Sequence, residues 1–157
     1  MKPKVYLETT VVSYLTARPS RDIVVAAHQE LTRQWWDQRR NDYHLLVSEV
    51  VLREAAAGDP EAAERRGAVL AGTDVLEVGE QALELAEELV RCGAVPDGAA
   101  EDALHIAIAV TNGVDYLLTW NCAHIANAAM RRAIDDVCLQ RGYEPTVLCT
   151  PEELFEE

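Results

Sequence analysis

The chain alternates short apolar runs with longer segments of mixed polarity. Five runs of four or five residues, rich in Val, Leu and Tyr, are typical of buried strands. They cover residues 4–7, 43–47, 74–78, 115–119 and 146–149. Several turn signals separate these runs from their neighbours, such as Gly58-Asp59-Pro60. The pattern therefore predicts short strands separated by helical segments.

Helical periodicity fills the segments between these runs. Val24, Ala27, Leu31 and Trp35 fall on one face of a predicted helix, and Ser48 is predicted to cap another. The predicted helices cover residues 9–16, 22–40, 48–57, 61–70, 81–92, 99–110 and 123–141. Strands that alternate with helices favour an α/β fold, here a three-layer α/β/α sandwich around a mainly parallel sheet of four or five strands. In such sheets the functional crevice lies at the carboxyl ends of the strands.

Length and composition fit one globular domain spanning residues 1–157. No apolar run approaches the ~18 residues of a membrane span, and the start of the chain shows no signal-peptide pattern. The four cysteines form no Cys-x-x-Cys pair, which favours a reduced, cytoplasmic protein with buried thiols.

Charge is distributed unevenly along the chain. Residues 1–60 hold 8 basic and 8 acidic residues, whereas residues 61–157 hold 6 basic and 19 acidic ones and so carry the whole net charge of −13. A generic nucleic-acid binder is basic, because neutralisation of phosphates supplies most of its affinity. Any contact with RNA must therefore be local, through basic residues of the N-terminal part or through bound cations.

Three acidic residues do not fit a solvated surface. Glu8 ends the first strand, Glu54 is the lone charge on an otherwise apolar helix side, and Asp102 lies on a helix that is apolar nearly all round. A buried carboxylate is costly unless it is paired, hydrogen-bonded or bound to a metal. No lysine or arginine lies on the same predicted faces, so a divalent cation is the simplest counter-charge. Oxygen ligands favour Mg²⁺ or Mn²⁺ over Zn²⁺.

Other chemistry has weaker support in the sequence. The chain contains no Gly-rich nucleotide-binding motif and no Gly-x-Ser-x-Gly elbow. His105 and His124 are better interpreted as hydrogen-bonded structural histidines than as ligands, and Trp120 is at least as well explained by packing as by stacking on a base.

Four motifs, in order along the chain, carry a resemblance to a known family. They are Glu8-Thr9-Thr10 after the first strand, Ser48 with Glu54 six residues later, Asp102-Ala103-Leu104-His105-Ile106-Ala107, and Leu117-Leu118-Thr119-Trp120-Asn121. Together they resemble the PIN-domain family, small metal-dependent ribonucleases that include the VapC-like toxins of toxin–antitoxin pairs. The resemblance covers nearly the whole chain.

The resemblance implies a Mg²⁺- or Mn²⁺-dependent endoribonuclease. Glu8, Glu54 and Asp102 would hold the metal and act in catalysis together with Asn121. Two departures matter, because Glu8 stands where most members have Asp, and Asn121 stands where many have a fourth carboxylate. Three carboxylates suit one cation better than two.

The resemblance also implies roles for supporting residues and partners. Thr10 and Thr119 would fix the carboxylates through hydrogen bonds, and Arg18 and Arg21 are the best candidates for contacts with an RNA substrate. An antitoxin protein and a homodimer are the expected protein partners. Two alternatives stay open, namely a PIN-like binding module with a degenerate site and a metal-dependent phosphohydrolase. The second ranks last because Glu8-Thr9-Thr10 lacks the nucleophilic aspartate that it needs.

Overall fold

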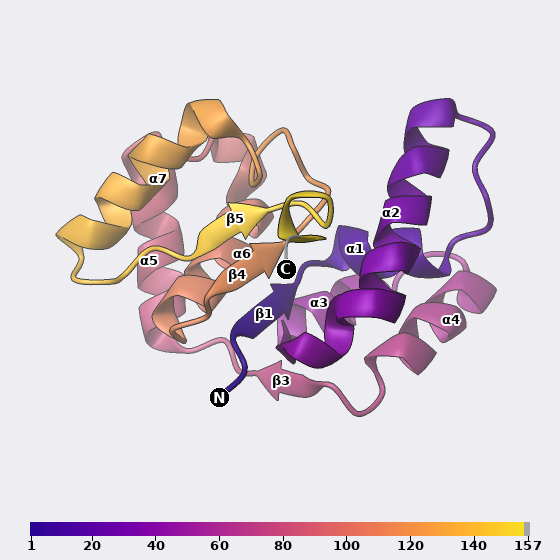
Figure 1. The fold of residues 1–157 in the computed structure, drawn as a ribbon. Coiled ribbons are helices and arrows are strands. Elements are labelled where there is room, and N and C mark those ends of the chain that lie inside the picture. Colours follow the sequence, from indigo (N-terminus) through magenta and orange to yellow (C-terminus); the bar gives the residue numbers. More distant parts are fainter. Residues whose placement is uncertain (156–157) are drawn as a thin grey trace.

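A five-stranded, all-parallel sheet forms the centre of the molecule. The structure is a computed structural model that describes residues 1–155. The strands are β1 (Lys4–Leu7), β2 (His44–Ser48), β3 (Asp74–Leu76), β4 (Tyr116–Leu118) and β5 (Val147–Cys149). Their order across the sheet is β3-β2-β1-β4-β5, so β1 lies in the middle (Figure 1). The predicted mainly parallel sheet is confirmed.

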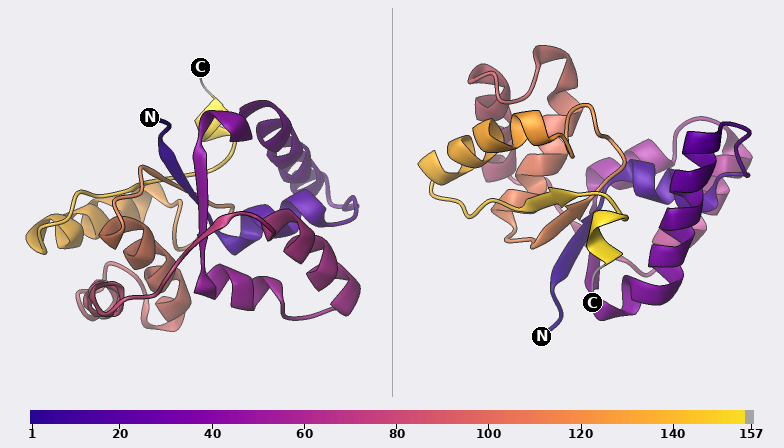
Figure 2. Two further views of the ribbon diagram at one scale, coloured as in Figure 1. Left: turned by 90° about the horizontal axis from the view of Figure 1, so that it is seen from below. Right: turned by 45° about the horizontal axis from the view of Figure 1, so that its top comes forward.

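Helices pack on both sides of this sheet. They are α1 (Thr9–Thr16), α2 (Ile23–Arg39), α3 (Glu49–Ala55), α4 (Pro60–Leu70), α5 (Glu80–Arg91), α6 (Ala100–Thr111) and α7 (Ala128–Gln140). Short 3₁₀ helices cover Arg40–Asp42, Asp97–Ala99 and Glu153–Phe155. Helices α1 to α4 gather on one side and α5 to α7 on the other (Figures 1 and 2). The predicted three-layer α/β/α sandwich is thus confirmed.

The central elements are nearly continuous apolar runs in the sequence because they are buried on all sides. In β1, Val5, Tyr6 and Leu7 are all buried, because neighbouring strands flank β1 and helices cover both of its faces. Helix α6 is buried along most of its length, from Ala103 to Val110 apart from Leu104. Within residues 1–155 no helix combines the length and apolarity needed to cross a bilayer.

Parallel pairing brings the carboxyl ends of three strands to one edge. Tyr6 of β1 pairs in register with Leu46 of β2 and Leu117 of β4. Two residues further on, Ser48, Glu8 and Thr119 therefore follow one another across this edge. The edge where the sequence predicts the functional crevice therefore carries polar residues from the ends of three neighbouring strands.

One predicted helix is too long at its start. The sequence predicts helix over residues 123–141, but α7 begins at Ala128. The preceding residues form turns, in which the backbone carbonyl of Asn121 accepts hydrogen bonds from the amides of Ile125 and Ala126. The side chain of Asn127 then caps α7 by accepting from the amide of Ala129. The early boundary was wrong because these two asparagines close the turn and start the helix locally.

The four cysteines divide into two classes. Cys138 and Cys149 are buried, as expected, whereas Cys92 and Cys122 are exposed, so the expectation of buried thiols is wrong for that pair. Burial raises the pKa of the Cys138 thiol to about 11 and that of Cys149 to about 12. A thiolate is the reactive form, so these two thiols are protected twice, by burial and by protonation.

This division predicts the pattern of thiol labelling. In the native protein at pH 8, a maleimide reagent should modify only Cys92 and Cys122, whereas in urea it should modify all four. Peptide mass spectrometry identifies the labelled sites. Fast labelling of Cys138 or Cys149 in the native state would contradict the described packing.

Candidate functional site

Glu8 is a buried carboxylate at the end of the central strand. It lies between β1 and α1, is 5% exposed, and its backbone amide donates to the carbonyl of Leu118 at 3.0 Å. The hydroxyls of Thr10 and Thr119 both donate to its Oε1, at 2.5 and 2.6 Å. Two hydrogen bonds, one from the first turn of α1 and one from the end of β4, thus offset part of the cost of burying this charge.

Glu54 approaches the same place from helix α3. Ser48 starts this helix, because its hydroxyl accepts a hydrogen bond from the amide of Val51 at 3.3 Å. The predicted cap is thereby confirmed. The Oε1 atom of Glu54 accepts hydrogen bonds from Nε2 of His105, at 2.9 Å, and from the hydroxyl of Thr9. Burial acts to raise the pKa of Glu54, but these hydrogen bonds outweigh it, so the pKa lies below its ordinary value.

A buried hydrogen-bond network holds His105 in place. Its Nδ1 is 2.7 Å from the hydroxyl of Tyr6, which in turn is 2.8 Å from the hydroxyl of Ser48. Because the carboxylate of Glu54 can only accept, Nε2 of His105 carries the proton. Burial acts to lower the pKa of His105, but the bond to Glu54 and the charges of nearby carboxylates outweigh it and raise the pKa. Residues from β1, β2 and α6 thus act together to orient the carboxylate of Glu54.

The donor atoms of this site fit a divalent cation. Ligand atoms of Glu8, Glu54 and His105 all lie within 4.8 Å of one another. The hydrogen bonds described above end on Oε1 of each glutamate, which leaves Oε2 of each to take a further ligand. Within residues 1–155 no lysine or arginine forms an ion pair with either glutamate. The two glutamates supply hard oxygen ligands, whereas both nitrogens of His105 are already engaged.

Asp102 lies beside this cluster and is bonded elsewhere. Its Oδ2 is 3.0 Å from Nδ1 of His124, and its side chain is 20% exposed, so it is less buried than Glu8. Asp102 lies one turn before His105 on α6, and residues three apart share a helix face. The structure therefore brings Glu8 and Glu54 together and places Asp102 one helical turn from His105, outside the compact cluster.

Asn121 uses its amide oxygen within its own turn. The Oδ1 atom accepts a hydrogen bond from the backbone amide of His124 at 3.0 Å, while the amide of Asn121 donates to the hydroxyl of Thr119 at 2.9 Å. Asn121 thus holds His124 against Asp102 and supports Thr119, which in turn holds Glu8.

Trp120 closes the sheet edge by packing. Its ring stacks on His28 with centroids 4.0 Å apart, and its Nε1 donates to the hydroxyl of Thr32 at 2.7 Å. Its backbone amide donates to Thr10 at 2.8 Å, so the packed indole also fixes a threonine that supports Glu8. The ring is 8% exposed, which favours packing over stacking on a base.

Several residues of the network could not be assigned a role from the sequence. Tyr6 is one residue of an apolar strand, and Thr9 is one of two adjacent threonines. Their common signal is polarity at strand ends and on otherwise apolar elements, the same signal that identified Glu8. His105 is the hydrogen-bonded buried histidine that the sequence favours, but it also touches the carboxylate cluster.

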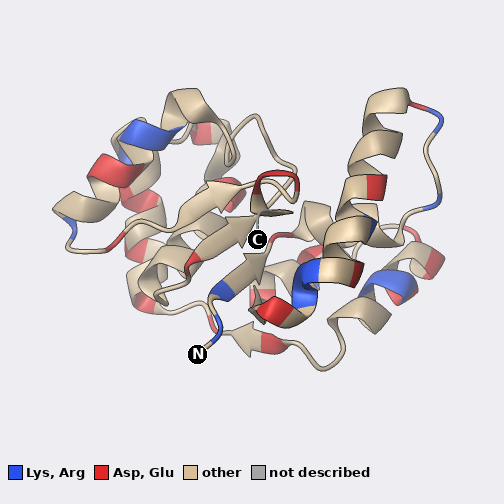
Figure 3. Ribbon diagram, in the orientation of Figure 1, with Lys and Arg blue, Asp and Glu red and all other residues tan. Residues whose placement is uncertain are grey.

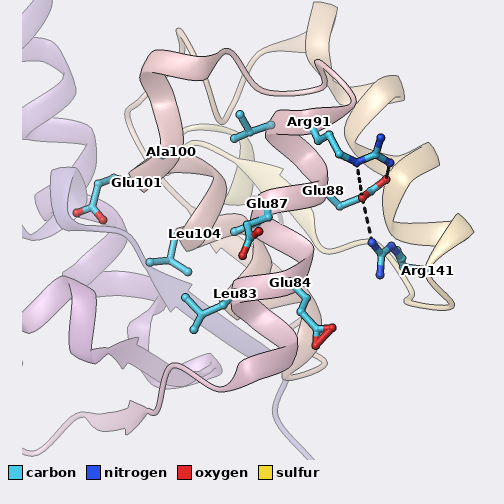
Figure 4. Close-up of a pocket in the computed structure, with 11 residues that line it drawn as sticks. Leu83, Glu84, Glu87, Glu88, Arg91, Ala100, Glu101, Leu104 and Arg141 are labelled. Atoms are coloured by element: carbon cyan, nitrogen blue, oxygen red, sulfur yellow. Dashed lines mark hydrogen bonds and ion pairs between the residues drawn. The ribbon is translucent and has the colours of Figure 1, made fainter.

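A larger groove lies away from the carboxylate cluster, between α5 and α6. It encloses about 660 Å³ and is lined by apolar side chains such as Leu83 and Leu104 and by several charged ones (Figure 4). At one end Glu88 accepts hydrogen bonds from Arg91 and Arg141, which lower its pKa to about 2. Glu84, Glu87 and Glu101 also line the groove, so it combines an apolar floor with an acidic rim and lacks the buried carboxylate pair found at the sheet edge.

Comparison with known proteins agrees with the geometry. No protein-family model matches the chain, and no curated protein matches it. Among solved structures, VapBC2 from Rickettsia felis bound to a promoter DNA fragment matches with a TM-score of 0.61 and 14% identity, over 94% of this chain and 98% of that one. VapC20 from Mycobacterium tuberculosis, a toxin that cleaves the Sarcin-Ricin loop, matches with a TM-score of 0.59 and 19% identity, over 82% and 94%. VapBC-1 from nontypeable Haemophilus influenzae matches with a TM-score of 0.59 and 14% identity, over 95% and 98%. The chain therefore has the PIN-domain fold of these proteins.

The buried network gives a stability prediction. Replacement of Tyr6 by Phe removes one oxygen and leaves both Ser48 and Nδ1 of His105 short of a partner. We expect it to lower the free energy of unfolding by about 1–3 kcal/mol in urea denaturation. Tyr116→Phe on the adjacent strand is the matched control, because its ring packs edge-on against Tyr43 outside the network, and should cost within ~0.5 kcal/mol. Equal costs for the two variants would contradict the network.

Proposed function

We propose that this chain is a Mg²⁺- or Mn²⁺-dependent endoribonuclease and the toxin of a toxin–antitoxin pair. The observation that carries the proposal is the pair Glu8 and Glu54, whose carboxylates meet at the carboxyl edge of a parallel sheet without an ion pair to lysine or arginine in residues 1–155. The shared fold with VapC proteins supports the same conclusion, and one of those neighbours is a toxin that cleaves the Sarcin-Ricin loop.

In this proposal each residue of the site has a defined task. Glu8 and Glu54 hold the cation, Thr10 and Thr119 orient the first carboxylate, and Thr9 and His105 orient the second. When bound, the ion supplies a water of lowered pKa and positive charge for the attacked phosphate.

Asp102 and Asn121 complete the proposed site. Asp102 would serve as the third carboxylate at the position one turn from His105, where His124 now holds it. Asn121 would act through its neighbours, because its amide oxygen fixes the turn that carries His124. With three carboxylates against the double charge of one ion, the site suits a single cation.

The comparisons also support a protein partner. Two of the neighbours are VapBC assemblies. We therefore propose that this chain also binds an antitoxin, which blocks its site until the antitoxin is released. A homodimer, the second partner implied by the sequence resemblance, stays a prediction that light scattering tests directly.

A binding module with a degenerate site is the second candidate. The engagement of Asn121 within its own turn and the pairing of Asp102 with His124 favour it, since both reduce the number of free metal ligands. It differs from the first candidate in one outcome, because it predicts no RNA cleavage with any divalent ion.

Cleavage assays and growth assays test the proposal together. Expression of the wild-type chain should arrest bacterial growth, and the purified protein should cleave total cellular RNA at discrete positions with Mn²⁺. Glu54→Gln should abolish both effects, since it removes one of the two carboxylates of the compact cluster and leaves the cation too weakly held. Glu87→Gln, an exposed glutamate in the α5–α6 groove, is the control and should act like the wild type. Cleavage by Glu54→Gln at the wild-type rate would contradict the proposed site.

A further inference from the structure

A second cavity brings three arginines together in an otherwise acidic chain. It lies between the end of α1 and the first turns of α4 and encloses about 490 Å³. Arg18, Arg65 and Arg66 line it, together with the polar side chains of Ser13 and Thr16. Figure 3 shows basic segments in the loop before α2 and on α4, on the α1–α4 side of the sheet. The cavity is therefore a local basic site in a chain with a net charge of −13.

Backbone carbonyls fix two of these arginines and leave part of each guanidinium available. Nε of Arg65 donates to the carbonyl of Thr16 at 3.1 Å. Arg66 donates from Nε to the carbonyl of Ala55 at 2.8 Å and from Nη2 to that of Ala57 at 2.7 Å. A guanidinium has five N–H donors, so Arg65 keeps four and Arg66 keeps three beyond these bonds. Carbonyl oxygens bear no net charge, so these bonds leave the positive charges uncompensated.

Carboxylates do not neutralise the cluster. Within residues 1–155, none of the three arginines has a carboxylate oxygen within 4.0 Å, although Asp59 and Glu61 also line the cavity. The carboxylate of Asp59 accepts a hydrogen bond from the amide of Ala62 at 3.0 Å, as the N-cap of α4. Most other arginines pair with acids, as Arg53 does with Glu101. Unpaired arginines on fixed backbone supports are the usual chemistry of phosphate recognition.

Helices α1 and α3 connect the arginine cavity to the two glutamates. Helix α1 begins directly after Glu8 and ends at Thr16, and its eight residues span ~12 Å. Helix α3 carries Glu54, and Arg66 bonds to the carbonyl of the next residue, Ala55. Helix α1 thus lines the cavity directly, and α3 is tied to it through the bond from Arg66, so the two sites keep a fixed separation.

We propose that this cavity binds a backbone phosphate of the RNA strand whose scissile phosphate lies at Glu8 and Glu54. The inference rests on the proposed nuclease function and names the part of the substrate that the cavity takes. Arg18 and Arg65 contact the phosphate, while Arg66 chiefly braces the end of α3. The acidic residues that dominate residues 61–157 repel RNA elsewhere, so this cluster sets the direction in which the strand leaves the site.

RNA binding in the absence of divalent ions tests the cavity separately from catalysis. The probe is a fluorescently labelled, mixed-sequence single-stranded RNA of ~20 nucleotides, titrated with protein in EDTA and followed by anisotropy at several salt concentrations. Arg18→Gln and Arg65→Gln should each weaken binding several-fold and lower the slope of log affinity against log salt by about 0.7. Arg132→Gln, an exposed arginine on α7, removes the same charge elsewhere and should leave the slope unchanged. Arg65→Lys should restore part of the affinity.

The outcomes separate this inference from the proposed function. The proposed phosphate site is wrong if Arg18→Gln, Arg65→Gln and Arg132→Gln bind RNA equally well, or if the wild type does not bind at low salt. This holds even if the protein cleaves RNA. Selective loss in the first two variants supports the cavity even if no cleavage is found. Thermal unfolding checks that Arg65→Gln, which loses the bond to Thr16, still folds, and Arg18→Gln removes no such bond.

Discussion

Two carboxylates held at one edge of a parallel sheet are the constraint on which the rest of this structure depends. Glu8 is almost fully buried, and Glu54 lies close enough for their ligand atoms to fall within 4.8 Å. Like charges at this separation repel, and burial makes each charge more expensive. The protein offsets the cost with threonine hydroxyls and one imidazole, and with no ion pair to lysine or arginine in the described chain. A site built this way is stabilised further by a cation of high charge.

The fold supplies this site because its central elements converge there. Strand β1 leads into Glu8, β2 ends at the serine that caps the helix of Glu54, and β4 leads into Thr119. Tyr6 and His105 are buried between these elements and form a hydrogen-bonded chain from Ser48 to Glu54. The orientation of Glu54 therefore depends on residues in the core. The second cavity follows from the same arrangement, because α1 and α3 carry the arginine supports at their far ends.

The sequence predicted the elements and the two central acids for physical reasons. Short apolar runs with helical segments between them define a parallel sheet, and a charge at the end of a buried strand, as at Glu8, is conspicuous. The partners of Asp102 could not be predicted in this way. Its bond to His124 joins two segments 22 residues apart. The bond also depends on the turn that Asn121 closes, and the sequence pattern predicts helix for the part of that turn that contains His124. The roles of Tyr6, Thr9 and the α4 arginines likewise depend on contacts between distant segments, which leave no periodic signal.

The central claim is that Glu8 and Glu54 together hold one divalent cation. Thermal unfolding with increasing Mn²⁺ tests it most directly. A cation that binds only the native state raises the free energy of unfolding, by about 2.7 kcal/mol at 100 Kd, and so raises the midpoint. We expect a rise for the wild type, none for Glu8→Gln, and a smaller one for Asp102→Asn, whose side chain lies outside the compact cluster. An unchanged midpoint for the wild type at millimolar Mn²⁺, or a rise that persists in Glu8→Gln, would contradict the account and leave the buried acids as internal hydrogen-bond acceptors.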